Sequence, residues 1–341
     1  MNEYVIAPKE ANKDIEKVID SFIQLFETSH YNESIISIYM GGGFGRGEGS
    51  VIKEKNLYVA LNDYDLFAIY TGNIKSSEYE RYFKSLNVHA GMEHVDVELV
   101  PLTKIMSYIY EKKLSQSIYD LLLGSVCIWK NQMLPEYSNF LDVALQDCIR
   151  NQYLITTRSC YDVLRTRLWC VIAPMKYSKE TVYFDMTYKN HTFRCMQLIK
   201  ACTAILDAVL IVEKKYTSPK FSDKIILFLH SEFAKLFDEE SKFVVLIVEK
   251  KLKNNVKFEY FNNSTVEKIV TIYSIAIDYC VKKSLFNYFY YWFRTGIGNL
   301  CQTQKSKKAS LSVNKMLKNI SLYYKKLNML AAFLRCQYDK K

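Results

Sequence analysis

The sequence lacks cysteine and histidine clusters at the spacing of a metal-binding or redox motif. Its nine cysteines occur singly from Cys127 onward, no two form a CxxC pair, and no histidine lies at ligand spacing from two of them. Structural zinc sites and disulfide frameworks both need such clusters. The pattern argues against both and is typical of a protein from a reducing compartment, so we predict a cytoplasmic location.

A leader peptide and a long apolar run are also missing. The N-terminal segment from Met1 to Val18 is charged and has no apolar core of the kind found in signal peptides. The most apolar stretches, Ala204–Val212 and Phe243–Val248, are flanked by charge. Both are shorter than the roughly 20 residues that a membrane-spanning helix needs. We therefore expect a soluble protein without a membrane partner.

Proline is scarce as well. The chain has five prolines and none after Pro219, and proline is the residue that most strongly interrupts a helix. From about Thr103 onward the apolar residues recur mostly at helical spacing, so we predict a second half that is nearly all helix. The expected helical runs are Ala144–Val171, Cys195–Val212, Lys224–Phe237, Val266–Val281 and Leu311–Leu334.

The first half combines helical and strand-like patterns. Apolar residues in Asp14–Phe26 form one stripe at helical spacing, which predicts a helix. The short apolar runs Ile35–Met40, Leu66–Tyr70 and Val95–Val100 predict strands. The fold class that follows is α+β, a mixed sheet with flanking helices in the first half and a mostly α-helical second half.

The domain boundary is predicted in the turn-like stretch between Trp129 and Asp142. We assign residues 1–138 to a mixed, catalytic domain. Residues 139–341 form the predicted helical domain, which we expect to cover the active site and to bind the acceptor. The boundary is placed by the turn-like composition of this stretch, within a chain whose pattern changes from mixed to mostly helical.

One glycine cluster follows the first predicted strand. Six of the eleven glycines lie within nine residues, at positions Gly41, Gly42, Gly43, Gly45, Gly47 and Gly49. Such a cluster indicates a close backbone approach or positive φ angles, and phosphate is the common guest of exposed backbone N–H groups. No register gives GxGxxG, and Gly47 precedes Glu48 rather than the lysine of a P-loop. A glycine-rich turn without a ligand is the alternative.

Two pairs of acids follow the alternation of strands. Asp63 and Asp65 stand at the start of one strand-like run, and Asp96 and Glu98 stand in the next. Side chains two residues apart in a strand point to the same face, so each pair places its carboxylates together. Adjacent carboxylates repel unless a cation lies between them, and Mg²⁺ prefers oxygen ligands of this kind. If the strands are neighbours, the acids converge beside the glycine cluster.

This order of features resembles the polymerase-β-type nucleotidyltransferase superfamily, whose signature is a glycine turn after a strand, then DxD, then one acid on a later strand. The turn Met40–Gly49 is similar to the GSxxRGEG form of aminoglycoside nucleotidyltransferases and other small bacterial members. Asn62–Leu66 resembles the [SN]DxDL segment, and Tyr119–Trp129 resembles the helix and strand that follow it. The match covers about residues 35–130. The helical half resembles only vaguely those members found in surface-polysaccharide gene clusters.

The resemblance implies an α+β fold of the nucleotidyltransferase type and a division of roles among the residues. Asp63, Asp65 and Asp96 would be catalytic and would hold two Mg²⁺ ions, with Mn²⁺ as the alternative metal. Glu98 competes with Asp96 as the third metal ligand, and Asp96 is favoured because aspartate is typical there. Residues implied to bind the nucleotide phosphates are Gly42, Gly43 and Arg46.

Two departures accompany the resemblance. Gly43 takes a position where many members have serine, and Gly43 and Asp63 are 20 positions apart, further than in the family. The additional residues Ser50–Leu61 are expected to form a hairpin or a flap. Arg46 has the alternative of a surface arginine. Glu48 is either a base close to the metal or an acid at a helix N-terminus, and we favour the second.

The implied activity is transfer of an NMP, with ATP as the expected donor, to a hydroxyl or phosphate acceptor with release of pyrophosphate. A small-molecule acceptor is favoured over RNA or protein. The alternatives are a toxin or defence-type enzyme that modifies tRNA or a protein, and a catalytically idle nucleotide-binding module. The segment from Lys305 to the end holds ten Lys or Arg and one acid, which would suit RNA, although a solvated helix face is the simpler interpretation.

Overall fold

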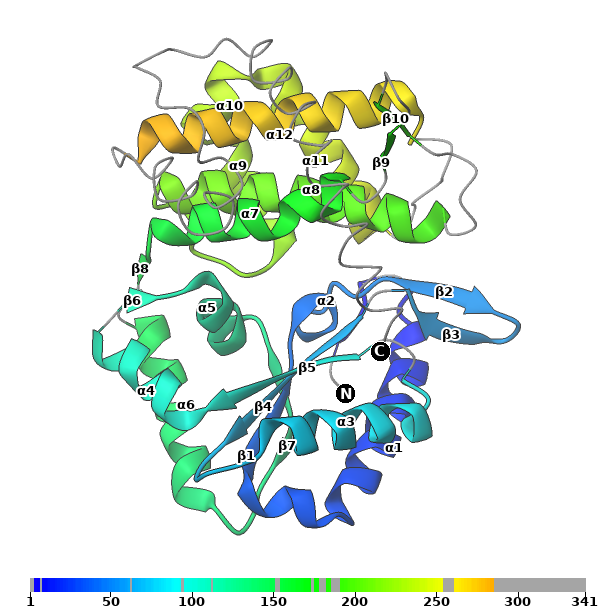
Figure 1. Ribbon diagram of the computed structural model, residues 1–341, viewed down its shortest axis with the longest axis vertical. Coiled ribbons are helices and arrows are strands. Elements are labelled where there is room, and N and C mark those ends of the chain that lie inside the picture. Colours follow the sequence, from blue (N-terminus) through cyan, green and yellow to red (C-terminus); the bar gives the residue numbers. More distant parts are fainter. Residues whose placement is uncertain are drawn as a thin grey trace.

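The computed structural model describes most of the chain as far as Ser284. The described residues are 3–6, 8–61, 63–92, 95–111, 113–150, 154–172, 175–177, 182–184, 191–253 and 261–284. They form one part around a sheet and another made almost entirely of helices, one above the other in Figure 1. The coarse prediction of an α+β fold is confirmed. The predicted helix Leu311–Leu334 and the basic segment from Lys305 onward lie outside the described residues.

A four-stranded sheet of order β5-β4-β1-β7 forms the centre of the first part. Its strands are β1 (Ile35–Met40), β4 (Tyr64–Tyr70), β5 (Val95–Pro101) and β7 (Val126–Lys130). Strand β1 is antiparallel to both β4 and β7, whereas β4 and β5 are parallel. The three predicted strands are confirmed. Strand β4 begins earlier than the apolar run suggests, because Tyr64 and Asp65 already pair with Val95 and Asp96.

Helices α1 (Ala11–Glu27) and α3 (Ser76–Ala90) cover one face of this sheet. The apolar stripe predicted for Asp14–Phe26 is the buried side of α1, and its Phe26 ring stacks at 5.7 Å from the ring of Phe83 on α3. Strand residues such as Ile38 and Leu66 point into the same cluster. The pattern that predicted the helix is therefore also the pattern that attaches it to the sheet.

The remaining short elements of the first part connect these layers. They are η1 (His30–Ser34), α2 (Gly42–Gly45), β2 (Val51–Glu54), β3 (Leu57–Ala60), α4 (Leu102–Glu111), β6 (Lys113–Leu114) and α5 (Gln116–Leu123). The expected hairpin in Ser50–Leu61 is confirmed, because β2 and β3 pair antiparallel and Leu61 N–H donates to the Ser50 carbonyl at 2.8 Å.

The second part is helical, as predicted, but two of the expected runs are divided. Its elements are α6 (Pro135–Arg150), β8 (Leu154–Ile155), α7 (Arg158–Ile172), β9 (Met175–Tyr177), β10 (Val182–Phe184), α8 (His191–Val212), α9 (Phe221–Leu229), α10 (Glu232–Leu236), α11 (Asp238–Leu252) and α12 (Asn263–Lys283). The run Ala144–Val171 is interrupted because β8 pairs with β6 of the first part. The run Lys224–Phe237 is interrupted at Ser231, whose hydroxyl caps α10.

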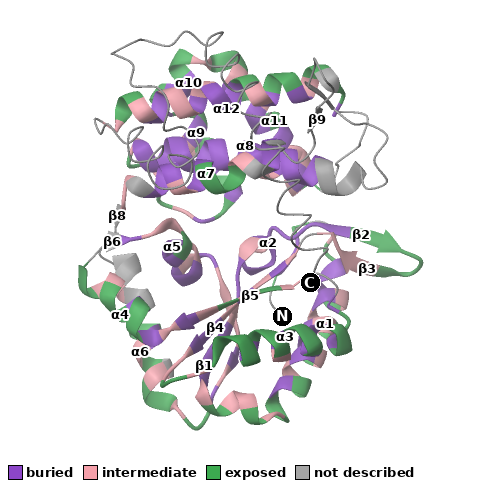
Figure 2. Cartoon of the chain, in the orientation of Figure 1, coloured by how far each residue is buried: buried purple, intermediate pink, exposed green. Residues whose placement is uncertain are grey.

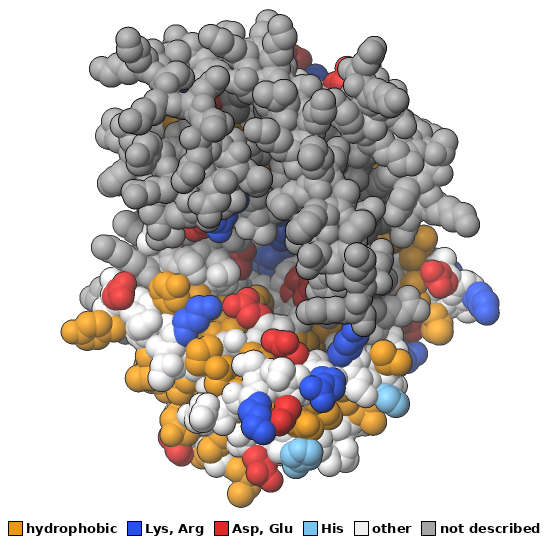
Figure 3. Space-filling view, in the orientation of Figure 1, with side chains coloured by type: hydrophobic (Ala, Val, Ile, Leu, Met, Phe, Trp, Pro, Cys, Tyr) orange, Lys and Arg blue, Asp and Glu red, His pale blue; other side chains and the backbone are white. Residues whose placement is uncertain are grey.

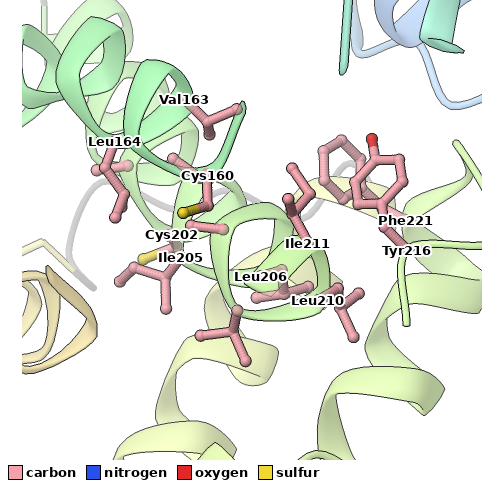
Figure 4. Close-up of a cluster of buried hydrophobic side chains, with 14 of the residues drawn as sticks. Cys160, Val163, Leu164, Cys202, Ile205, Leu206, Leu210, Ile211, Tyr216 and Phe221 are labelled. Carbon is pink, nitrogen blue, oxygen red and sulfur yellow. The ribbon is translucent and has the colours of Figure 1, made fainter. Parts of the chain in front are cut away.

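Helix α8 is the central helix of the second part. Its stretch Cys195–Val212 is long and apolar enough to cross a membrane by length and composition, which corrects the sequence-based expectation that no run reaches that length. In the folded chain 94% of the stretch is buried, as in the core helix of a soluble domain. Figure 4 shows side chains of α7 and α8, among them Cys160 and Cys202, meeting in this core.

The second face of the sheet and the helical part share one hydrophobic core. Ile36, Ile69 and Val100 from the strands belong to the same buried cluster as the inward side chains of α7, α8, α11 and α12. Figure 2 shows the buried residues concentrated in α7, α8 and the strands. The predicted boundary near residues 129–142 stays a prediction, and α6, which begins at Pro135, contacts both β1 and α5.

Candidate active site

The glycine cluster forms a tight turn where β1 ends, on the side of the sheet that faces the helical part (Figure 1). Gly41 N–H donates to the carbonyl of Asp65 at 2.7 Å, which holds the turn against β4. Gly42 has φ +57°, and a Cβ at this position would collide with the Asp65 carboxylate. Gly43 follows in α2 and is buried. Glycine at position 42 therefore allows the Asp65 carboxylate to lie directly against the backbone.

The predicted acids lie at the same edge of the sheet. Asp65 and Asp96 are direct partners in the parallel β4–β5 register, so they lie side by side on one face. Asp63 immediately precedes β4 and, by strand alternation, projects to this face too. Leu66 points to the opposite face and is buried there. The expectation that the two strands are neighbours is confirmed, and we call Asp63, Asp65 and Asp96 the acid face.

Asp65 is the most enclosed member of the acid face. Its side chain has no hydrogen bond or ion pair with any of the residues that the structure describes. Burial raises the pKa of Asp65, the positive charges of Lys200 and Arg46 lower it, and the carboxylates of Asp63 and Asp96 raise it again. An unpaired, partly desolvated carboxylate between two others is a position that an added cation would stabilise.

Of the two candidates for the third acid, Asp96 is the one beside Asp65. Glu98 lies two residues further along β5, where its partner on β4 is Phe67. Its carboxylate is 3.5 Å from Lys104 Nζ on α4, and both side chains are about half exposed. Glu98 thus shares the face of Asp96 but lies further from Asp65, so the register favours Asp96 as the third ligand, and the choice between the two acids stays a prediction.

A lysine from the helical part reaches the acid face. Lys200 Nζ on α8 donates to Asp63 Oδ2 at 3.0 Å, across a separation of 137 residues. Lys200 is not among the site residues predicted from the sequence. A signal existed, because Lys200 and Asp207 are the only charged residues in Cys195–Val212. Charges within a buried apolar helix usually have a partner.

Arg46 and Glu48 connect the glycine turn to the helical part rather than to solvent. The Glu48 carboxylate accepts hydrogen bonds from the N–H groups of Phe221 and Ser222, both at 3.0 Å, and so caps the N-terminus of α9. Arg46 Nε donates to Glu48 at 3.3 Å. The interpretation of Glu48 as an acid at a helix N-terminus is confirmed. The alternative of a surface arginine is wrong, because the Arg46 side chain is 9% exposed.

The guanidinium of Arg46 stays charged in this setting. Burial on its own would lower the pKa of Arg46, but the carboxylates of Asp120 and Glu48 raise it above its ordinary value. Arg46 also contributes to the potential at Asp65. Arg46 therefore interacts electrostatically with Asp65 of the acid face and also with Glu48 and Asp120.

A second polar cluster, which we call the junction network, fills the contact between α5, α8 and α9. Lys224 Nζ donates to Asp207 Oδ1 at 2.8 Å and to the Tyr216 hydroxyl. Tyr216 in turn donates to Asp120 Oδ1 at 2.8 Å. Burial raises the pKa of Asp120, which Lys224 and Arg46 partly offset. Sequence reasoning missed this network because its members come from distant segments with no common motif.

The donor chemistry of the acid face fits Mg²⁺. Three carboxylates on one face are hard oxygen ligands, and the Asp65 side chain has no hydrogen bond or ion pair among the described residues. Within the described part of the chain, no three Asp, Glu, His or Cys side chains are already gathered closely enough to hold a metal ion. Lys200 supplies the positive charge at Asp63 instead. Metal binding would therefore require the three carboxylates to move closer together and Lys200 to release Asp63.

No protein-family model, curated protein or solved structure matches the chain. The resemblance to nucleotidyltransferases therefore depends on the motifs in the sequence. The geometry adds three observations that the motifs did not contain: the contact between Gly42 and Asp65, the pairing of Asp65 with Asp96, and the approach of Lys200. These observations are the basis for a functional argument.

Proposed function

We propose that the protein is a magnesium-dependent nucleotidyltransferase that moves an NMP, AMP from ATP in the first instance, to a hydroxyl or phosphate acceptor. The single observation that carries the proposal is the acid face against the glycine turn. Asp65 pairs with Asp96 and lies against Gly42, so carboxylates and the glycine backbone are brought together at one point. Such a combination suits a ligand that carries both phosphate and divalent metal.

Each acid has a distinct part in this proposal. Asp63, Asp65 and Asp96 would hold Mg²⁺, which supplies charge stabilisation for in-line displacement at the α-phosphorus. Asp96 is exposed, so an acceptor hydroxyl can reach it from solvent and transfer its proton there. The acceptor oxygen then bonds to the α-phosphorus as the bond to the bridging oxygen of the β-phosphate breaks, and pyrophosphate leaves.

The glycine turn and Arg46 complete the donor site. Gly42 and Gly43 have no side chains to block approach of the phosphates to the backbone. Arg46 is held in place by Glu48 and the ring of Phe221, whose centroid is 4.9 Å from the guanidinium carbon. A fixed, desolvated positive charge favours a polyanion without any further ordering of a long side chain.

Incubation with each α-³²P-labelled NTP and a cell extract tests the proposal. We expect Mg²⁺-dependent transfer of label, most from ATP, to small molecules, and loss of transfer in Asp63→Asn and Asp65→Asn. Label on RNA would favour the tRNA-directed alternative, to which the basic segment from Lys305 onward is suited. Equal transfer by wild type and Asp65→Asn, or nucleotide binding without transfer to any acceptor, would contradict the proposal.

A further inference from the structure

Three positively charged side chains surround the ring of Phe221 at the start of α9. From the ring centroid, Lys224 Nζ lies at 4.6 Å, the Arg46 guanidinium carbon at 4.9 Å and Lys251 Nζ at 5.2 Å. Figure 3 shows blue Lys or Arg and red Asp or Glu side chains near one another where the sheet part meets the helical part. One aromatic ring attracts cations but cannot balance three full charges, so each cation needs an anion.

Two of the three cations have their anion and the third does not. Lys224 is paired with Asp207 at 2.8 Å, and Arg46 with Glu48 at 3.3 Å. Lys251, on the last turn of α11, is only 6% exposed. Its ammonium group forms no hydrogen bond and no ion pair with any residue in the described ranges. Among the described residues, this ammonium group thus lies against the Phe221 ring and is paired with no anion.

The groups that face Lys251 come from the same site as the acid face. Burial lowers the pKa of Lys251 to about 8, with Arg46 and Lys200 acting in the same direction, and Glu48 and Asp65 opposing them. Glu48 is already engaged by Arg46 and by the N-terminus of α9. A methionine would fill this position without the cost of desolvating an ammonium group. The ammonium group of Lys251 does not stabilise the fold, so we attribute its presence here to the binding of an anionic ligand.

We propose that Lys251 and Lys200 bind the phosphate groups of the substrate beside the acid face. Lys200 Nζ already reaches the site's edge at Asp63, and Lys251 lies further in, beside Arg46. A chain of phosphates carries several negative charges in a row, which matches two lysines and an arginine better than a single monoanion does. The identity of the ligand as a nucleoside triphosphate rests on the proposed function.

Binding of inorganic tripolyphosphate, measured by titration calorimetry in EDTA, tests the inference without base, ribose or metal. Wild type is expected to bind, Lys251→Met to lose about tenfold or more in affinity, and Lys251→Arg to keep most of it. Lys242→Met is the matched control, because it removes one charge from the exposed side of the same helix, where Lys242 pairs with Asp238. It should bind as wild type does.

The inference is overturned if Lys251→Met binds tripolyphosphate as tightly as wild type, or if wild type does not bind it at all. Lys251→Gln serves as a second neutral variant should Lys251→Met fail to fold, and far-UV circular dichroism checks both. The result is separable from the proposed function. If tripolyphosphate binding depends on Lys251 but the protein transfers no nucleotide, the phosphate site stands and the proposed transferase activity is refuted. If nucleotide transfer occurs and is unaffected by Lys251→Met, the transferase activity stands and the phosphate site is refuted.

Discussion

The junction network and the acid face are two charged regions at the same contact between sheet and helices, yet they are built differently. In the junction network, Lys224 binds Asp207 and Tyr216, and Tyr216 binds Asp120. On the acid face, Asp65 has no partner in the described part of the chain. Lys251 has none there either. The junction network is compensated internally, whereas on the acid face Lys200 pairs with Asp63 and leaves Asp65 without a cation among the described residues.

This difference separates a structural role from a ligand-binding role. Removing one member of a compensated buried pair leaves an unpaired charge and is strongly destabilising. Removing a buried charge that has no partner removes its desolvation cost and therefore stabilises the fold. Stability and function should therefore respond in opposite directions to substitutions in the two regions.

The largest expected effect is on activity at the acid face. Asp65→Asn should lower Mg²⁺-dependent pyrophosphate release by about 1000-fold or more, roughly 4 kcal/mol of transition-state stabilisation. Its stability should be unchanged or increased, because the neutral amide avoids repulsion by Asp63 and Asp96. A pyrophosphate assay and urea unfolding measure the two quantities. Glu78→Gln, which removes an exposed acid on α3, is the control, and loss of fold in Asp65→Asn would contradict the comparison.

The next effect is on stability in the junction network. Lys224→Met should lower the free energy of unfolding by about 3 to 5 kcal/mol, because it leaves Asp207 buried without its cation. Lys251→Met, a substitution of the same type in the same surroundings, should be neutral or stabilising at pH 7. Urea unfolding of both variants gives the sign directly. Equal destabilisation by the two substitutions would remove the distinction between the regions.

The pH dependence of stability sharpens the contrast for Lys251. Its pKa is about 8 in the folded chain against an ordinary 10.5. Below pH 8 the ammonium is charged in both states and its burial penalty is fully present. As pH rises from 8 to 10.5 the folded state loses its proton first, so this group adds stability, on the order of 3 kcal/mol. Urea unfolding at pH 7 and pH 10 should show this gain in the free energy of unfolding for wild type but not for Lys251→Met. The same change with pH in both proteins would contradict the assignment to Lys251.

The smallest expected effect is at Glu48, which joins the glycine turn to α9. Glu48→Gln keeps the shape but loses the negative charge that accepts from two N–H groups and from Arg46. We expect a loss of only about 1 to 2 kcal/mol in the free energy of unfolding, because the glutamine oxygen still accepts hydrogen bonds and the carboxylate of Asp120 still offsets the charge of Arg46. Hydrogen exchange at Phe221 and Ser222 should accelerate in this variant. Unchanged exchange would show that the cap contributes little.

The acid face could be predicted from the sequence because it depends on the alternation of neighbouring residues within short strands. Alternation placed Asp63 and Asp65 together, and a strand at Val95–Val100 supplied Asp96 on the same face. The choice between Asp96 and Glu98 needed the strand register, which the apolar pattern alone does not determine. The two divided helical runs were missed for related reasons: β8 is two residues long, and the cap at Ser231 is a single hydroxyl.

The cations of the site could not be predicted from local patterns. Lys200 is 137 residues from the Asp63 that it pairs with, and Phe221 is 173 residues from Glu48. Helical periodicity indicates which side of α11 is apolar, but it does not indicate that Lys251 on that side faces the glycine turn. Charged residues within apolar helical runs are the sequence signal that points to such positions.

The most direct test of the central claim is calorimetric binding of α,β-methylene-ATP with and without Mg²⁺, in wild type and in Asp65→Asn. The account predicts that Mg²⁺ strengthens binding to wild type and that Asp65→Asn, still folded, loses this metal dependence. Binding that is insensitive to Mg²⁺ in wild type, or equally sensitive to it in Asp65→Asn, would contradict the assignment of the acid face as the site for metal and nucleotide.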